Sequence, residues 1–230
     1  MNLRLALTFI LLGALTAVAA VLAGGFLGWP ALSMLLLGVG YARGDARVFG
    51  KQPDGTRAWY GTVVMAPYLI IVWLVWKILR WTRREDCCNE VLPGAFIGRR
   101  AGTAELPDRT ELIVDLTAEL WESPGVRQNR DYICLPILDG AAPTAAELIA
   151  LITRLVNEKR ILYIHCAEGH GRAAMTAVAL MIARGQADSV DQAILLAKQK
   201  RPQIHLSRPQ KALIEKTVRE LRILAHQTTV

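Results

Sequence analysis

The chain has 230 residues, 53% of them hydrophobic, and its mean hydropathy of +0.28 is high for a water-soluble protein. The net charge of +7 comes entirely from residues 1–84, which hold nine basic and only two acidic residues. Because this positive charge flanks hydrophobic segments, the composition argues against nucleic acid as a partner and favours a membrane. Four cysteines do not form a disulfide framework in a chain of this length.

Two long apolar segments open the chain. The first, residues 5–42, is too long for a single membrane-spanning helix, and Gly24-Gly25 and Gly28-Trp29-Pro30 interrupt it. We therefore expect two spans from this segment and a third after a polar loop, at residues 5–24, 29–42 and 58–79. A cleaved signal peptide and a bundle of buried soluble helices are the alternatives.

This pattern predicts three regions along the chain: a transmembrane region at residues 1–81, a linker at 82–90 and a catalytic domain at 91–230. We expect a multi-pass protein of a bacterial-type inner membrane. The positive residues on the two sides of the spans are nearly equal in number, so they do not fix the orientation. A reactive thiol is better preserved in a reducing compartment, which favours a cytoplasmic catalytic domain.

The catalytic half alternates strand-like and helix-like segments. Short apolar runs predict strands at residues 95–98, 111–116, 131–135 and 161–164. Helical spacing predicts helices at residues 144–158, 173–183, 189–200 and 209–225. This alternation is typical of an α/β domain with a mostly parallel central sheet flanked by helices, in which ligands bind at the carboxyl ends of the strands.

One loop carries the clearest chemical signal. The segment from His165 to Arg172 follows the last predicted strand and precedes a predicted helix. Its glycines allow the backbone N–H groups to converge on one anion, and the helix adds the positive end of its dipole. The guanidinium of Arg172 can bind two phosphate oxygens, and Cys166 is expected to be a nucleophilic thiolate in such surroundings. The predicted phosphate-binding residues are Ala167, Glu168, Gly169, His170, Gly171 and Arg172.

His165, Cys166 and Arg172 together match the pattern His-Cys-x5-Arg and so resemble the cysteine-dependent protein tyrosine and dual-specificity phosphatases. The resemblance extends over residues 91–220 and implies the dual-specificity-phosphatase fold. It also implies that Cys166 is the nucleophile and Arg172 the phosphate ligand. One position departs from the family: Ala173 stands where a serine or threonine hydroxyl helps the thiolate leave the intermediate. The departure predicts slower hydrolysis of the phosphocysteine.

A leaving alkoxide needs a proton donor, which we expect on a loop at the same sheet edge as Cys166. Asp139 follows a predicted strand in the sequence Leu135-Pro136-Ile137-Leu138-Asp139-Gly140. The resemblance assigns the general acid to this position; a simple turn aspartate is the alternative. The resemblance gives Asp115 a structural role.

Further residues around the loop have predicted places or supporting roles. We expect His165 to orient the loop, whereas His170 and Glu168 are expected at its rim. The segment containing Arg201, Pro202 and Gln210 is similar to one in the subgroup that dephosphorylates phosphatidylglycerophosphate, where the glutamine lies near the active site.

The sequence therefore predicts a membrane-anchored phosphatase that acts on a phosphorylated lipid or a phosphorylated protein through a phosphocysteine intermediate. A weakly active phosphate-binding module (a pseudophosphatase) and a rhodanese-like sulfurtransferase are the alternatives. No metal or organic cofactor is implied.

Overall fold

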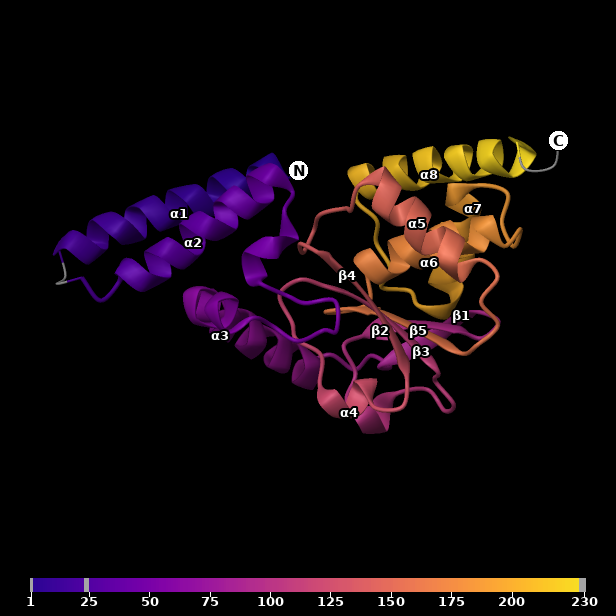
Figure 1. The fold of residues 1–230 in the computed structure, drawn as a ribbon, viewed down its shortest axis with the longest axis horizontal. Helices are drawn as coiled ribbons and strands as arrows, with labels where there is room; N and C mark the ends of the chain where they lie inside the picture. Colours follow the sequence, from indigo (N-terminus) through magenta and orange to yellow (C-terminus); the bar gives the residue numbers. More distant parts are fainter. Residues whose placement is uncertain (1, 23–24, 228–230) are drawn as a thin grey trace. The chain divides into compact units, whose positions relative to one another are not determined.

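A computed structural model describes residues 2–22 and 25–227, with side chains up to Leu221. The ends predicted for the first span at Gly24 and for the catalytic domain at Val230 lie outside these residues. The chain forms two compact units (Figure 1). Unit 1 comprises Met1–Glu85, Thr117–Glu122 and Pro136–Ala141. Unit 2 comprises Asp86–Leu116, Ser123–Leu135 and Ala142–Val230.

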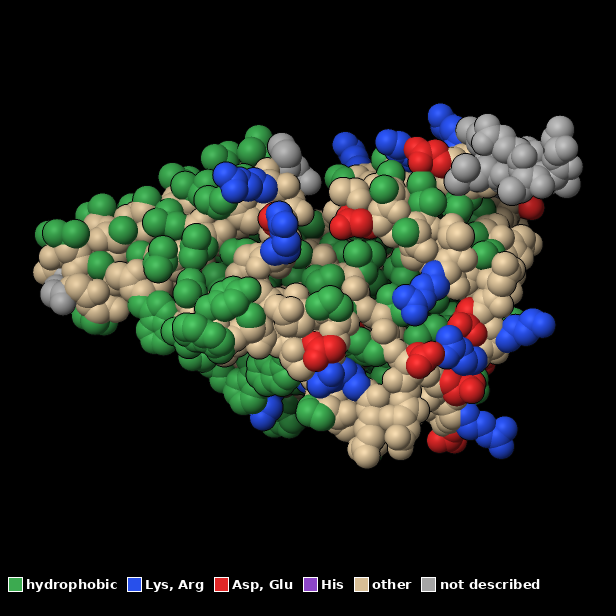
Figure 2. Space-filling model, in the orientation of Figure 1, with side chains coloured by type: hydrophobic (Ala, Val, Ile, Leu, Met, Phe, Trp, Pro, Cys, Tyr) green, Lys and Arg blue, Asp and Glu red, His purple; other side chains and the backbone are tan. Residues whose placement is uncertain are grey.

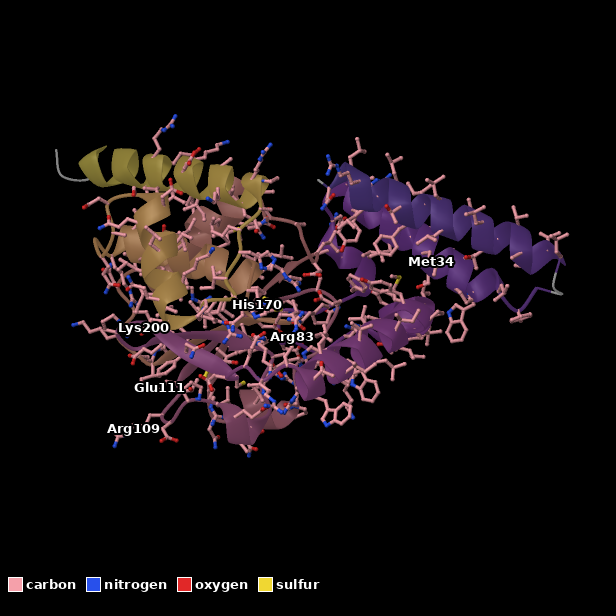
Figure 3. The ribbon with its side chains drawn as sticks, turned by 180° about the vertical axis from the view of Figure 1, so that it is seen from behind. Met34, Arg83, Arg109, Glu111, His170 and Lys200 are labelled. Carbon is pink, nitrogen blue, oxygen red and sulfur yellow. The ribbon has the colours of Figure 1, made fainter. Side chains whose placement is uncertain are left out.

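Unit 1 is helical, with α1 (Leu3–Leu22), α2 (Gly28–Arg43), the short 3-10 helix η1 (Ala46–Phe49) and α3 (Trp59–Thr82). α1 and α2 pack closely because glycines stand at their contact. A Cβ atom built on Gly38 would lie 2.6 Å from the side chain of Ile10, which leaves no room for a larger residue. Farther along the pair, Thr16 Oγ1 lies 3.9 Å from the sulfur of Met34 (Figure 3).

A proline inside α3 explains a bond between two helices of unit 1. Pro67 has no N–H group, so the carbonyl of Val63, four residues earlier, loses its usual helical donor. The indole Nε1 of Trp29, in α2, donates to that carbonyl at 3.0 Å. The bond satisfies the released acceptor and joins the start of α2 to the first turns of α3.

The surface of unit 1 is unusually apolar. Figure 2 shows hydrophobic side chains along its helices, and many large ones are exposed. Two helices among the described residues, α1 and α3, are long and apolar enough to cross a membrane, whereas α2 has only 16 residues. Length and composition alone support this assignment.

Unit 2 is built on a five-stranded sheet. The strands are β1 (Cys88–Leu92), β2 (Ala95–Arg99), β3 (Leu112–Thr117), β4 (Asp131–Ile137) and β5 (Leu162–Cys166), in the order β1-β2-β5-β3-β4. β5 pairs in parallel with β2 and β3, and β1 is antiparallel to β2. The α/β prediction with a mostly parallel sheet is thus confirmed. β1 was not predicted, and it begins inside the stretch 82–90 that was expected to be a linker.

The helices of unit 2 are α4 (Pro124–Arg127), α5 (Ala145–Leu155), α6 (Arg172–Ala183), α7 (Val190–Lys200) and α8 (Arg208–Gln227). α5 to α8 gather on one side of the sheet, and α4 lies on the other (Figure 1). Side chains cap two of them: Thr144 Oγ1 accepts from the N–H of Glu147, and Ser189 Oγ accepts from the N–H of Gln192. α6 is central, since residues 172–182 are all buried.

Candidate active site

The predicted phosphate-binding loop connects β5 to α6. Cys166 is the last residue of β5, and Arg172 is the first residue of α6. The Cys166 side chain is buried, and its Sγ accepts a hydrogen bond from the backbone N–H of Gly169 at 3.2 Å. The loop therefore curls back over the sulfur, as the sequence predicted.

Each of the four loop carbonyls after Cys166 accepts a hydrogen bond from a neighbouring segment. The carbonyl of Ala167 accepts from the backbone N–H of Arg100 at 3.3 Å, and that of His170 accepts from the N–H of His205 at 3.1 Å. Between them, the carbonyls of Glu168 and Gly169 accept from the guanidinium of Arg201 at 3.0 and 3.2 Å.

This arrangement of carbonyls orients the N–H groups of the loop. In a planar trans peptide, the carbonyl of one residue and the N–H of the next point in opposite directions. Four carbonyls turned outward therefore turn the N–H groups of residues 168–171 to the other side. The bond from Gly169 to the Cys166 sulfur shows that this side is the side of the thiol. Consecutive N–H groups that converge in this way form an anion-binding site.

Arg201 has a larger part in this loop than the sequence indicated. Its side chain is almost completely buried, at 1% exposure, and it also donates to the Asn89 side chain at 2.8 Å. The sequence drew attention to Arg201 only through its resemblance to a lipid-phosphatase segment. An arginine placed directly before a proline at the end of a helix was the only available signal, and it did not identify the loop carbonyls as its partners.

Gly169 satisfies two requirements at once. Its φ angle of 77° lies in the left-handed region, where other residues are strained. A Cβ atom at this position would also lie 2.3 Å from the backbone carbon of Gly98 in β2. The close approach between the loop and β2 therefore depends on a glycine here.

Arg172 begins α6 with a buried side chain, and its Nη1 lies 3.5 Å from the carbonyl of Leu116. The positive end of the α6 dipole and the loop N–H groups lie at the same place. Ala173 follows, fully buried and without a hydroxyl group. In the next turn, Thr176 Oγ1 donates to the carbonyl of Arg172, so this hydroxyl is directed along the helix.

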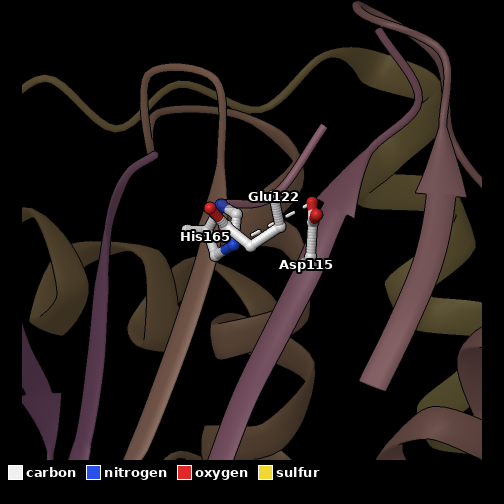
Figure 4. A group of neighbouring side chains, drawn as sticks. All are labelled: Asp115, Glu122 and His165. Atoms are coloured by element: carbon white, nitrogen blue, oxygen red, sulfur yellow. Dashed lines mark ion pairs between the residues drawn. The ribbon is translucent and has the colours of Figure 1, made fainter. Parts of the chain in front are cut away.

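His165 is fully buried beside Asp115 (Figure 4). The two residues are partners in the parallel pairing of β3 and β5, and His165 Nε2 lies 3.9 Å from Asp115 Oδ1. The hydroxyl of Tyr132 donates to the other oxygen of Asp115 at 2.5 Å. His165 also stacks on Tyr163, with ring centroids 5.6 Å apart. These contacts fix the residue directly before Cys166.

The remaining predicted residues of unit 2 lie around the same loop. Gln210 is buried, and a Cβ atom on Gly171 would be 3.7 Å from its Nε2. Glu168 is half-buried. His170, labelled in Figure 3, was expected at an exposed rim, but it is only 7% exposed because the segment containing His205 covers it.

Asp139 lies in the segment Pro136–Ala141, which belongs to unit 1. It comes two residues after the end of β4, and its backbone carbonyl accepts a hydrogen bond from the hydroxyl of Tyr41 at 3.0 Å. The structure thus brings Cys166, the loop, Arg172, His165 and Gln210 together in unit 2, whereas Asp139 is part of the other unit.

Known proteins with a similar sequence are phosphatases. A family model described as "Swiss Army Knife protein, DSP-PTPase phosphatase domain" (PTP-SAK) matches residues 110–225, half of the chain. The protein named "Putative tyrosine phosphatase 197R" of Invertebrate iridescent virus 6 is 38% identical over 81 residues. That match spans 31% of this chain and 30% of the viral protein, so less than a third of that relative's length is represented here.

Solved structures share the fold of the catalytic half. A structure described as "mouse putative dual specificity phosphatase complexed with zinc tungstate" is 25% identical, with a TM-score of 0.51 over 61% of this chain and 92% of its own. PTPMT1 in complex with PI(5)P has a TM-score of 0.55 at 16% identity, over 61% of this chain and 99% of its own. The second likeness concerns the fold alone.

Proposed function

The chain belongs to the DSP-PTPase family of cysteine-dependent phosphatases, and we propose that it hydrolyses phosphate monoesters through a phosphocysteine intermediate. One observation supports this most directly. The carbonyls of residues 167–170 point away from the thiol and accept hydrogen bonds from neighbouring segments. The N–H of Gly169 donates to the sulfur of Cys166. Such a set of inward N–H groups can stabilise both a thiolate and the equatorial oxygens of a phosphoryl group in transit.

In the proposed first step, the Cys166 thiolate attacks phosphorus and forms an S–P bond while the P–O bond of the ester breaks. Arg172 and the loop N–H groups stabilise the negative oxygens. Asp139 gives its proton to the departing oxygen, so an alcohol leaves.

In the second step, water attacks phosphorus and the S–P bond breaks. The Asp139 carboxylate takes a proton from that water, inorganic phosphate leaves, and the Cys166 thiolate is restored. His165 and Gln210 support the loop and do not exchange protons with the substrate in this scheme.

Ala173 favours a second candidate, a phosphatase domain that binds phosphate but turns over slowly. The buried alanine offers no hydroxyl to assist the departure of the sulfur. Rapid mixing distinguishes the two by the rate that follows the first turnover. A burst of one alcohol per Cys166 with almost no further release supports the second candidate, whereas steady multiple turnover, with or without a burst, supports the first.

We also propose that the protein is anchored in a membrane through α1 and α3. Large apolar side chains on both helices are exposed, including Leu11, Leu15 and Val18 on α1 and Ile70, Ile71 and Ile78 on α3. Only residues 83–87 separate α3 from β1, so an anchored α3 keeps the catalytic half near lipid head groups. A short connection of this kind raises the effective concentration of membrane-bound substrates.

The short connection suits a phosphorylated lipid and a membrane phosphoprotein equally, and we propose the lipid as the substrate, with the phosphoprotein as the alternative. That PTPMT1 is known in complex with PI(5)P shows that a protein of this fold holds a lipid phosphate. The resemblance around Arg201 and Gln210 suggests phosphatidylglycerophosphate as the first lipid to test.

The test measures phosphate release by the full-length protein in mixed micelles, with phosphatidylglycerophosphate and a phosphotyrosine peptide at matched concentration. We expect release from the lipid to exceed release from the peptide at least about tenfold, and Cys166→Ser to abolish both. Undiminished release by Cys166→Ser would refute the phosphocysteine mechanism. A preference for the peptide would instead refute only the lipid substrate.

A further inference from the structure

The segment Pro136–Ala141, which we call the acid loop because it carries Asp139, packs into the hydrophobic core of unit 1. Leu138 is only 2% exposed and belongs to the same buried cluster as Tyr41, Phe49 and Leu69. Leu138 directly precedes Asp139, so the apolar anchor and the proposed acid are neighbours in the chain.

Hydrogen bonds to the backbone fix the acid loop further. The hydroxyl of Tyr41, in α2, donates to the carbonyl of Asp139 at 3.0 Å. Asn2 Nδ2 donates to the carbonyl of Gly140 at 3.4 Å, and the N–H of Ala141 donates to the carbonyl of Leu138 at 3.0 Å. Two successive carbonyls beside the acid therefore accept donors from the N-terminal part of the chain.

Tyr41 is itself held in place, which makes it a suitable anchor. It is only 3% exposed, and its ring stacks on Phe9 of α1 with centroids 5.6 Å apart and an interplanar angle of 10°. Its backbone carbonyl accepts from the N–H of Asn2 at 3.3 Å. A buried donor with a fixed ring loses little freedom when it forms its hydrogen bond.

We propose that Tyr41 is a positioning residue for Asp139, and that α2, which carries Tyr41, therefore affects the step in which Asp139 acts. The inference rests on the proposed function, because it assumes that Asp139 protonates the leaving group. Tyr41 does not touch the substrate. It fixes the backbone of the residue that does.

The inference predicts an effect that depends on the leaving group. A nitrophenolate departs without protonation, whereas a more basic phenolate needs the proton of a general acid, whose contribution is typically about 10² to 10⁴ in rate. A displaced Asp139 would therefore slow the second kind of substrate and spare the first. Loss of overall folding would slow both equally.

The experiment compares p-nitrophenyl phosphate with phenyl phosphate, using the full-length protein in detergent micelles. For Tyr41→Phe we expect kcat/KM to fall about tenfold on phenyl phosphate and less than about twofold on p-nitrophenyl phosphate. In an Asp139→Asn background the same substitution should have no further effect, because the two residues act through one step. Tyr60→Phe, which changes an exposed tyrosine of α3, serves as the matched control and should match the wild type.

Leu138→Ala provides a second variant, since it weakens the apolar anchor without removing the hydroxyl bond. It should produce the same selective loss on phenyl phosphate. Equal losses on both substrates in Tyr41→Phe and Leu138→Ala, or wild-type behaviour in both, would overturn the inference while leaving the proposed function intact. If Asp139→Asn itself showed no selectivity for the leaving group, the assignment of the acid would fail, and the inference with it.

Discussion

Gly169 determines the shape of the loop that follows Cys166. Its positive φ and its approach to Gly98 both exclude a side chain, and its N–H is the one that reaches the Cys166 sulfur. A larger residue would move this N–H group away from the thiol. The sequence predicted the need for glycine in the loop, but the contact with β2 required the structure.

We therefore predict that Gly169→Ala lowers kcat/KM about a hundredfold, in line with the loss of one preorganised N–H donor. The measurement is steady-state hydrolysis of p-nitrophenyl phosphate by full-length protein. Gly185→Ala is the control, because Gly185 has a similar φ of 70° but open space around the position of a Cβ atom. Equal activity in the two variants would show that the close approach to β2 has no effect on the chemistry.

Cys87 and Cys88 form an ionisable pair. The hydrogen bond between their thiols lowers the pKa of Cys87 to about 7. Burial opposes this decrease, while a hydrogen bond with Tyr163 and the charge of Arg99 support it. The same pairing raises the pKa of Cys88, which keeps its proton.

A pH dependence follows from this pair. Above the pKa the thiolate dominates, so alkylation of Cys87 by iodoacetamide should rise between pH 6 and 8, with its midpoint at about 7, and then level off. The measurement is peptide mass mapping in a Cys166→Ser background, with half-buried Cys134 as the internal reference. Cys87→Ala should remove the rise at pH 7, and a Cys87 profile identical to that of Cys134 would contradict the prediction.

The turn between η1 and α3 binds the segment Thr117–Glu122, which also belongs to unit 1. Lys51 is 9% exposed, and its ammonium donates to the carbonyl and hydroxyl of Thr117 and to the carbonyl of Leu120, each at 2.7 Å. Arg57 donates to the carbonyl of Glu119 at 2.6 Å, and burial lowers the pKa of Arg57 to about 10. Lys51 and Arg57 thus donate hydrogen bonds to the backbone carbonyls of Thr117, Glu119 and Leu120.

Lys51→Met should leave three buried oxygens without this donor, at a cost of about 1–3 kcal/mol or more for the set. We expect the thermal unfolding midpoint of the full-length protein in micelles to fall by about 5 °C, since about 1 kcal/mol shifts it by 2–4 °C in a chain of this size. Lys200→Met, at an exposed lysine, is the control. An unchanged midpoint in Lys51→Met would show that the three bonds contribute nothing net.

The elements with regular apolar spacing were predictable, and those held by distant partners were not. The helices α5 to α8 and the strands β2 to β5 were predicted to within a few residues, because their apolar residues follow helical spacing or form short runs between turn signals. β1 was not predicted, because Cys88-Asn89-Glu90 interrupts the alternation of apolar and polar residues that is typical of a strand. It joins the sheet through its pairing with β2. That Leu138 and Tyr41 share one core could not be predicted, since they are far apart in the chain and each stands in an ordinary local context.

For the molecule as a whole, the structure shows a helical unit with an apolar exterior and an α/β phosphatase unit, in which the loop after β5 curls over the Cys166 sulfur. The sequence pattern predicted that the loop lies between β5 and α6 and curls over the Cys166 sulfur, and the roles of Cys166 and Arg172 stay predictions. It did not show that Arg201 orders the loop or that the acid loop packs with the N-terminal helices, because both depend on tertiary contacts.

The proposed membrane anchor leads to a prediction for the whole protein. Full-length protein should remain in the membrane pellet after extraction with alkaline carbonate, because α1 and α3 each have the length needed to cross a bilayer. Leu15→Arg, at a position with 68% exposure on α1, should weaken insertion by about 2.5–3.5 kcal/mol and release a larger fraction. Complete release of the unaltered protein would refute the anchor.

The bond from Trp29 to the carbonyl of Val63 has a consequence for how the helices recognise one another. Apolar helix surfaces can slide along each other at little cost, because one leucine contact resembles the next. A proline leaves a single vacant acceptor at one height of α3, and an indole at the start of α2 is the donor that meets it. In surroundings without water that acceptor has no other partner. The hydrogen bond between Trp29 and Val63 therefore fixes how far α2 and α3 are shifted along their axes, as a single polar residue fixes the register of a coiled coil.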